Sequence, residues 1–324
     1  MTLSKLAQIA NVSVSTVSKA LSDSPEISQK TRDTIINLAK EMGCFEKYYK
    51  PKYQKKVIAV ICPEILGLHY TQMATSIESE ISAHGGTMIL GVSNFSHKTQ
   101  TELIEYYTKF VGVDGIIIIE SQGSIKNDTS TPIVQIGLET EAKNTDCVRV
   151  DIFPAMIEAL STLAKYGHTR IGFVGEKLAV TEYGYFTQAM EKRMMYYSPQ
   201  DVIISEKRFY DAGYFAMDEI LKKKNKPTAI FAAYSHIASG ILQRLKEENM
   251  SVPDSLSLIC MDDISSMPYS DVNLSSIKMH LDDLCAIATD LLFQKMEKSY
   301  IKIKQSITVT REFVKGDSIK NLLD

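Results

Sequence analysis

Residues 2–43 read TLSKLAQIANVSVSTVSKALSDSPEISQKTRDTIINLAKEMG, and this stretch carries three helical patterns in succession. Thr2, Ser13 and Ser28 each precede a run of apolar residues at helical spacing, where a hydroxyl can cap the first turn. Gly43 ends the third run. We therefore expect a small all-α unit of three short helices packed on one another.

The second helix, expected at about residues 14–22, has the surface of a DNA recognition helix. Its inward side carries Val17 and Leu21, whereas its outward side carries mostly small polar side chains and one lysine. Small side chains let the backbone approach the base edges in the major groove. Ser28 and Thr31, at the start of the third helix, can hold a phosphate with hydroxyl and backbone N–H groups. A three-helix bundle that contacts only proteins is the alternative interpretation.

The same stretch resembles the N-terminal helix-turn-helix of the LacI/GalR family of bacterial transcriptional regulators. The resemblance is carried by Ala7, Ala10-x-Val12-Ser13, Thr16-Val17-Ser18-Lys19 and Ser28-x-x-Thr31-Arg32. The DNA contacts that it implies are Val14, Ser15 and Lys19 to bases, and Thr16, Ser18, Ser28 and Thr31 to the backbone. Lys19 stands where the family usually has Arg, so a single ammonium replaces a guanidinium that reads guanine with two hydrogen bonds.

A basic linker is expected at residues 46–56, after a helix-turn-helix domain at residues 1–45. The family usually has a short hinge helix here that inserts a Leu wedge into the minor groove. In this chain the wedge position falls on Tyr53, Pro51 interrupts a helix, and the segment is shorter than usual. We expect a basic tether that follows the phosphates, with a wedge formed by Tyr53 as the alternative.

Charge separates this head from the rest of the chain. Residues 1–56 hold ten Lys or Arg against five Asp or Glu, a net charge of +5, whereas the whole chain carries −3. A basic head on an acidic body is typical of a protein whose head alone meets a polyanion.

From residue 57 onward, short apolar runs alternate with helical patterns, as in VIAVI, TMILGV, GIIII and PIVQI. This is the rhythm of parallel strands with crossover helices. It recurs after about residue 150 in RIGFV, DVIIS, TAIFAA and SLICM. The fold class we predict for the body is α/β, with two lobes built on doubly wound parallel sheets and a ligand site at the carboxyl ends of the strands.

The resemblance to the LacI/GalR family extends over this body, residues 57–324. It is carried by Val113-Asp114-Gly115-Ile116, Gly167-His168-Thr169-Arg170-Ile171, Pro227-Thr228-Ala229-Ile230-Phe231, Val252-Pro253-Asp254 with Ser257, and Asp262-Asp263. It implies the type I periplasmic-binding-protein fold, in which the chain crosses between the lobes three times. The N-terminal lobe would span about 57–149 and 280–308, and the C-terminal lobe about 150–279 and 309–324.

Only part of the family's sugar site is present. Tyr70 fits the aromatic residue after the first strand, and Asp262 fits the Asp near the last strand. Glu182 falls where an Arg is expected; a carboxylate there accepts hydrogen bonds or pairs with a cation, and repels a phosphate. Tyr183 and Tyr234 complete the candidate effector site as residues that stack on a sugar ring, with ordinary packing as the alternative. A neutral or amino sugar is the expected effector.

Other classes of protein lack their sequence signals. The five cysteines are scattered and never form a C-x-x-C pair, so neither a disulfide framework nor a zinc site is expected. There is no 18-residue apolar run and no signal-peptide core at the N-terminus, which indicates a cytoplasmic protein without a membrane span. The motifs of nucleophilic, phosphate-binding, zinc and dinucleotide enzymes are absent. We expect no enzyme activity, no cofactor and no metal.

The sequence thus predicts a regulator, acting as a repressor of carbohydrate-utilisation genes, that binds double-stranded operator DNA as a homodimer. A small solute between the lobes would control it. One alternative keeps the DNA-binding head but has the body sense a partner protein, as a catabolite-control regulator does. A sugar-processing enzyme or a transport binding protein is the other alternative, against which the missing catalytic motifs and export signal argue.

Overall fold

The computed structural model describes residues 2–49, 55–125, 130–137, 145–262, 271–298 and 303–324. The chain divides into two compact units, Met1–Lys56 and Val57–Asp324. Within the described ranges, no helix is both long enough and apolar enough to cross a membrane.

The first unit is helical. Its elements are α1 (Leu3–Ile9), α2 (Val14–Leu21), α3 (Gln29–Glu41) and the short α4 (Phe45–Tyr48). The predicted caps are confirmed, because the side chains of Thr2, Ser13 and Ser28 each accept a hydrogen bond from the backbone N–H three residues on. The apolar faces of the helices meet in one core that includes Leu6, Val17, Leu21, Ile35 and Ala39.

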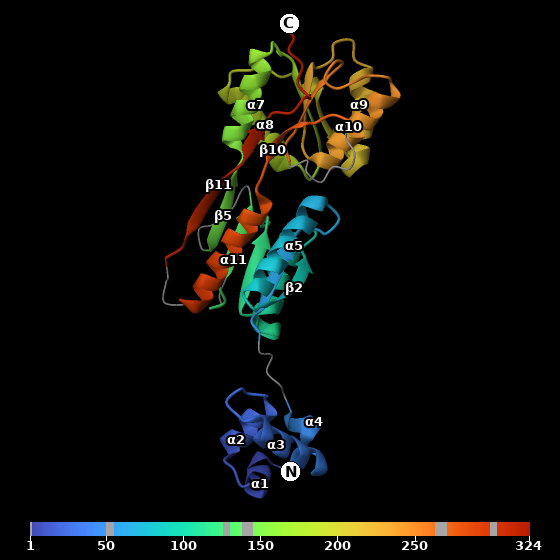
Figure 1. Cartoon of the computed structure of the whole chain (residues 1–324). Coiled ribbons are helices and arrows are strands. Elements are labelled where there is room, and N and C mark those ends of the chain that lie inside the picture. Colours follow the sequence, from blue (N-terminus) through green and yellow to red (C-terminus); the bar gives the residue numbers. More distant parts are fainter. Residues whose placement is uncertain (1, 50–54, 126–129, 138–144, 263–270, 299–302) are drawn as a thin grey trace. The chain divides into compact units, whose positions relative to one another are not determined.

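The second unit contains two lobes, each built on a six-stranded sheet. The N-lobe sheet has the order β11-β5-β4-β3-β1-β2, with every pair parallel. Its strands are β1 (Val57–Cys62), β2 (Thr87–Val92), β3 (Gly115–Ile119), β4 (Ile133–Gly137), β5 (Asp146–Asp151) and β11 (Ser306–Thr310). Helices α5 (Leu68–Ala83) and α11 (Leu281–Glu297) cover one face (Figure 1). Helix α6 (His97–Glu105) and the π-helix η1 (Tyr106–Val111) pack on the other face.

The C-lobe sheet has the order β12-β10-β9-β8-β6-β7. Its strands are β6 (Ile171–Glu176), β7 (Val202–Ser205), β8 (Ala229–Ala232), β9 (Ser257–Cys260), β10 (Ser275–Lys278) and β12 (Glu312–Val314). Helices α7 (Phe153–Lys165) and α8 (Val180–Lys192) lie on one side, and α9 (Phe209–Leu221) and α10 (Ser235–Glu247) lie on the other (Figure 1). A short 3₁₀ turn, Pro199–Asp201, precedes β7.

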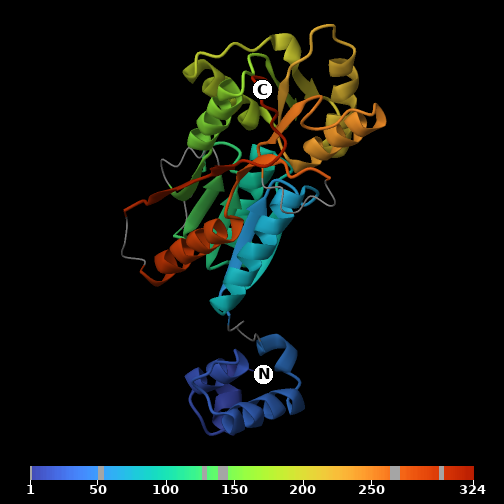
Figure 2. The same cartoon turned by 45° about the horizontal axis from the view of Figure 1, so that its top comes forward.

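The chain passes between the lobes three times, after β5, between β10 and α11, and at Arg311 between β11 and β12 (Figures 1 and 2). The prediction of two doubly wound α/β lobes is confirmed. One strand departs from the parallel pattern, since β12 pairs antiparallel with β10. It continues directly from β11 of the other lobe and so enters the second sheet from the lobe boundary. The backbone N–H of Arg311 donates to the carbonyl of Asp151 (2.9 Å), which ties two of the crossings together.

Candidate functional site

The outward face of α2 presents the side chains expected to read DNA. Val14, Ser15 and Ser18 are exposed, whereas Thr16 is partly buried and its hydroxyl lies 2.8 Å from that of the capping Ser13. Lys19 forms an ion pair with Glu26, whose side chain is 65% exposed. The Glu26 carboxylate therefore competes with a base for the ammonium of Lys19.

The start of α3 is organised as an anion site would be. Ser28 and Thr31 hydrogen-bond to each other through their hydroxyls (2.8 Å), and Ser28 also accepts the backbone N–H of Thr31. The first N–H groups of a helix have no partner within the helix and are available to a phosphate. Arg32 holds the preceding turn by donating to the Ser24 carbonyl (2.7 Å). Tyr53, the predicted minor-groove residue, lies outside the described residues.

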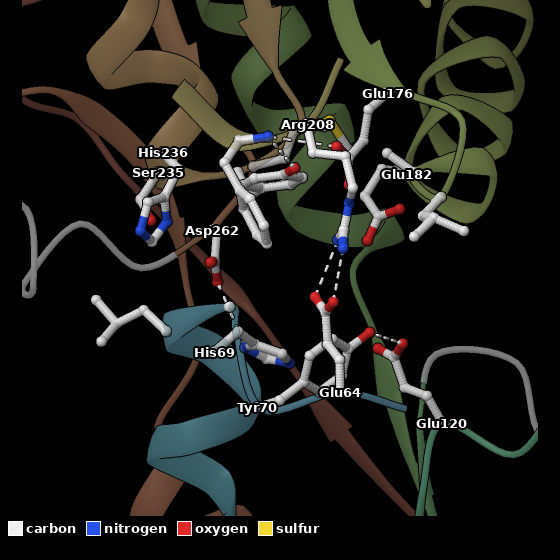
Figure 3. Close-up of a pocket in the computed structure, with 18 of the residues that line it drawn as sticks. Glu64, His69, Tyr70, Glu120, Glu176, Glu182, Arg208, Ser235, His236 and Asp262 are labelled. Carbon is white, nitrogen blue, oxygen red and sulfur yellow. Dashed lines mark hydrogen bonds and ion pairs between the residues drawn. The ribbon is translucent and has the colours of Figure 1, made fainter. Parts of the chain in front are cut away.

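The second unit contains a cavity between its two lobes, at the carboxyl ends of the strands, as predicted for such sheets. Its lining encloses about 680 Å³ of non-protein space, part of it open to solvent. Four of the five predicted effector residues line it: Tyr70, Glu182, Tyr234 and Asp262. In Figure 3 the labelled side chains of the two lobes point toward one another across this cavity.

Tyr183 does not line the cavity, unlike the other predicted effector residues. Its ring packs against Phe173 in the C-lobe core, with ring centroids 5.5 Å apart. The reason is helical geometry, because neighbouring residues on a helix point in directions about 100° apart. With Glu182 facing the cavity, Tyr183 faces the sheet.

An ion-pair bridge joins the two lobes across the cavity. Arg208, next to the start of α9, donates two hydrogen bonds to Glu64 of the N-lobe, at 2.7 Å and 3.0 Å. Its Nε donates to Glu176 of the C-lobe at 3.0 Å. These hydrogen bonds, above all those to Glu64, raise the pKa of the guanidinium. Both glutamates are buried.

Sequence reasoning missed this bridge, although a signal for part of it was present. Glu64 follows β1 by two residues, and Glu176 is the last residue of β6. Parallel α/β sheets bind ligands at this end of the strands, so each carboxylate could have been taken as a candidate. Arg208 precedes a helix in a segment without a distinctive motif, and nothing local identifies it.

The aromatic lining is hydrogen-bonded to the carboxylates and backbone. The Tyr70 hydroxyl donates to Glu120 at 2.6 Å (Figure 3). Burial, and then the charge of Glu120, raise the pKa of Tyr70, so this phenol stays protonated. The Tyr234 hydroxyl accepts the backbone N–H of Phe209 at 3.3 Å. Burial and Glu176 raise the pKa of Tyr234 as well.

The pKa of Glu182 is strongly perturbed. Burial, followed by the negative charge of Glu120, raises its pKa to about 7, and Asp262 adds to the increase while Arg311 opposes it. Asp262 itself lies 3.9 Å from the Nδ1 atom of His69, which comes from the N-lobe helix α5. Polar groups of the two lobes therefore face each other throughout the cavity.

Both the helical head and the two-lobed body are similar to known proteins. Residues 2–45 match the family of bacterial regulatory proteins of the lacI type, and residues 160–319 match the periplasmic binding protein-like domain. The chain is 28% identical over 321 residues to the HTH-type transcriptional repressor CytR of Escherichia coli (strain K12), covering 93% of this chain and 91% of CytR.

Solved structures of similar fold include a LacI family regulator from Silicibacter pomeroyi, with a TM-score of 0.77, 20% identity and 99% coverage of each chain. Another is a LacI family regulator from Enterococcus faecium with bound ribose, with a TM-score of 0.70, 22% identity, and coverage of 82% of this chain and all of that one.

A helix-turn-helix head joined to a two-lobed body with a cavity between the lobes defines a DNA-binding transcriptional regulator. This chain belongs to the LacI/GalR family of bacterial transcriptional regulators, as its sequence predicted.

Proposed function

We propose that this regulator is a homodimeric repressor of carbohydrate-utilisation genes, acting in the cytoplasm and controlled by a small solute that binds between its lobes. The observation that carries the proposal is the cavity, which takes charged and aromatic side chains from both lobes. A solute that touches both lobes stabilises one angle between them over another. It acts on DNA binding only through this difference in affinity, and no chemical step is required.

The cavity suits a polar, hydroxyl-bearing solute, neutral or amino. Its carboxylates accept hydrogen bonds from hydroxyl groups, and its aromatic residues can cover an apolar ring face. Arg311 supplies a donor, because its buried Nε–H has no hydrogen-bond partner among the described residues. The ribose bound to the E. faecium regulator supports a sugar-like ligand in this fold.

The DNA part of the proposal is tested first. The full-length chain is incubated with a random double-stranded DNA library, bound sequences are selected, and affinity for the selected site is measured by fluorescence anisotropy. We expect a pseudo-palindromic site, since two heads related by two-fold symmetry read two half-sites. A selection that yields no preferred sequence would contradict the proposal.

The residue assignment is tested on the same site. Lys19→Ala should weaken binding and relax the base preference, because a base contact is worth about 1–3 kcal/mol of discrimination. Lys192→Ala, at the exposed end of α8 in the body, is the control and should leave affinity unchanged. Neutral and amino sugars are then added to find one that changes operator affinity.

A further inference from the structure

The cavity between the lobes carries more negative charge than its own cations neutralise. Among the described residues that line it are five carboxylates and two guanidinium groups, so its formal charge is −3 when every carboxyl group is ionised. Arg208 is shared between Glu64 and Glu176. The lining carboxylates that Arg208 does not pair with are Glu120, Glu182 and Asp262.

The second guanidinium does not neutralise these three directly. Arg311 donates its Nη1–H to the carbonyl of Met261 at 3.0 Å. It acts on Glu182 only through its charge, which lowers the pKa less than burial and Glu120 raise it. Neither Glu120 nor Glu182 has an ion-pair partner within the part of the chain that the structure describes. Two carboxylates thus face the cavity without a cation.

We propose that the effector is a small organic cation whose ammonium group is held between Glu120 of the N-lobe and Glu182 of the C-lobe. The inference rests on the proposed function, and it names the chemical class of the solute. Figure 3 shows both carboxylates directed into the cavity, from opposite lobes.

Aromatic rings of the lining provide the second feature that suits a cation. Tyr70 and Phe95 lie edge to face with centroids 6.0 Å apart, and Phe209 and Tyr234 do so at 6.2 Å. The Arg208 guanidinium already lies over the Phe209 ring, 4.3 Å from its centroid, so Tyr70, Phe95 and Tyr234 are the rings left for a ligand cation. Ring faces attract an ammonium group, and the attraction is stronger where water is excluded. A ligand with an ammonium group on a compact hydroxylated or apolar body matches both the charge and the walls.

The same geometry links binding to lobe closure. Glu120 follows β3 in the N-lobe and Glu182 lies on α8 in the C-lobe, so their negative charges oppose closure while the cavity is empty. A cation between them converts this repulsion into two attractions, which favours the closed lobes. Because its pKa is raised to about 7, Glu182 is partly protonated near neutral pH in the empty cavity, and the repulsion acts in the ionised fraction; an ammonium group shifts the remainder to the carboxylate.

The test uses the full-length chain and matched pairs of compounds that differ in charge. The cations are glucosamine, galactosamine, putrescine and choline; the uncharged counterparts are the two N-acetyl sugars, 1,4-butanediol and 3,3-dimethyl-1-butanol. Glucose 6-phosphate is the anion. We expect at least one cation to raise the melting temperature in a dose-dependent way while its uncharged counterpart does not.

Variants then locate the ammonium. For the cation that raises the melting temperature, Glu182→Gln should weaken binding by about tenfold, because a close charge pair is lost. Glu191→Gln, an exposed change on the same helix, should alter it less than twofold. Wild-type affinity should rise from pH 6 to pH 8 as Glu182 ionises, with Tyr70, Glu120, Asp262 and Arg311 as the groups that face it.

The outcomes separate this inference from the proposed function. An uncharged compound or the anion that binds as tightly as the cations would overturn the inference and leave a solute-controlled regulator in place. If no compound changes either the melting temperature or operator affinity, both the inference and the solute control are contradicted. Operator binding is measured on the same samples, so the DNA-binding part is judged independently.

Discussion

Glu182 has a raised pKa in the folded chain, and this makes a prediction about stability. The pKa is about 7 in the folded chain against 4.5 for an ordinary glutamate. Between these values the folded state binds more protons than the unfolded state, so the free energy of unfolding falls as pH rises, and the loss is complete above pH 7. Glu182→Gln cannot ionise and escapes this loss.

The melting temperature of unliganded Glu182→Gln should therefore exceed that of the wild type by a margin that grows from pH 5 to pH 8. Each kcal/mol corresponds to about 2–4 °C in a domain of this size. Calorimetry across this pH range measures the margin, with Glu191→Gln as the control that should match the wild type throughout. A margin that is constant with pH would show that Glu182 ionises normally.

Lys19 and Glu26 make a second prediction at the residue scale. Their ion pair engages the only lysine of α2, and Glu26 adds a negative charge near the expected DNA face. Glu26→Gln should raise operator affinity by about threefold, because an exposed ion pair is worth about 0–1 kcal/mol and must open on binding. Glu41→Gln removes the same charge from an exposed position on α3 and should raise operator affinity less.

Anisotropy titrations of both variants at two salt concentrations would measure these affinities. The gain of Glu26→Gln should also disappear when Lys19 is already alanine. If the gain persists in the double variant, general charge and not the release of Lys19 accounts for it.

At the scale of elements, the contact between α9 and α10 depends on two glycines. A Cβ atom on Gly213 would lie 2.0 Å from the carbonyl oxygen of Ile237, and one on Gly240 would lie 2.1 Å from that of Tyr210. Both obstacles are backbone atoms, so the helices would have to separate. Gly213→Ala and Gly240→Ala should each lower the free energy of unfolding by about 1–3 kcal/mol or more.

Gly184 provides the matched control, since it lies within α8 and a Cβ atom there would meet nothing within 4 Å. Gly184→Ala should raise the free energy of unfolding by about 0.4–1 kcal/mol through the reduced entropy of the unfolded chain. Denaturant unfolding of the three variants checks both signs. Equal effects at all three positions would mean that α9 and α10 can move apart at little cost.

Local signals and distant contacts were predictable to different degrees. Thr2, Ser13 and Ser28 were identified as caps because the residues that decide a cap lie within three positions of it. The strands β5 and β11 were not identified, since DCVRVD and SITVT lack a continuous apolar run. These two strands pair with each other although about half the length of the chain separates them in the sequence, and such a contact leaves no local sequence pattern.

For the cavity too, residues with a local sequence signal could be predicted, whereas contacts between distant residues could not. Tyr70, Glu182, Tyr234 and Asp262 line the cavity, and the sequence could indicate them because each stands next to a strand or helix end that its pattern locates. The bridge from Arg208 to Glu64 joins residues 144 positions apart. Only the folded arrangement of the two lobes brings them together.

For the whole molecule, the bridge from Arg208 to Glu64 opposes the opening of the lobes. Arg208→Gln removes it and leaves two buried carboxylates, Glu64 and Glu176, without their cation, which adds repulsion across the cavity. The unliganded body should then populate the open lobes more. An effector that binds the closed lobes would have to work against this shift, and its half-effective concentration should rise roughly tenfold.

Small-angle scattering of the unliganded chain and effector titrations of operator binding measure the two consequences. Lys177→Gln is the control, because its ion pair with Glu206 is exposed and lies within the C-lobe. Arg208 also lines the cavity, so a weaker effector response alone could come from a lost ligand contact. The double variant Arg208→Gln with Glu64→Gln separates the two explanations. Removing the Glu64 carboxylate relieves the repulsion across the cavity and should restore part of the lobe closure, whereas it cannot restore a direct contact between Arg208 and the ligand. An unchanged radius of gyration in Arg208→Gln would show that the bridge does not set the lobe angle.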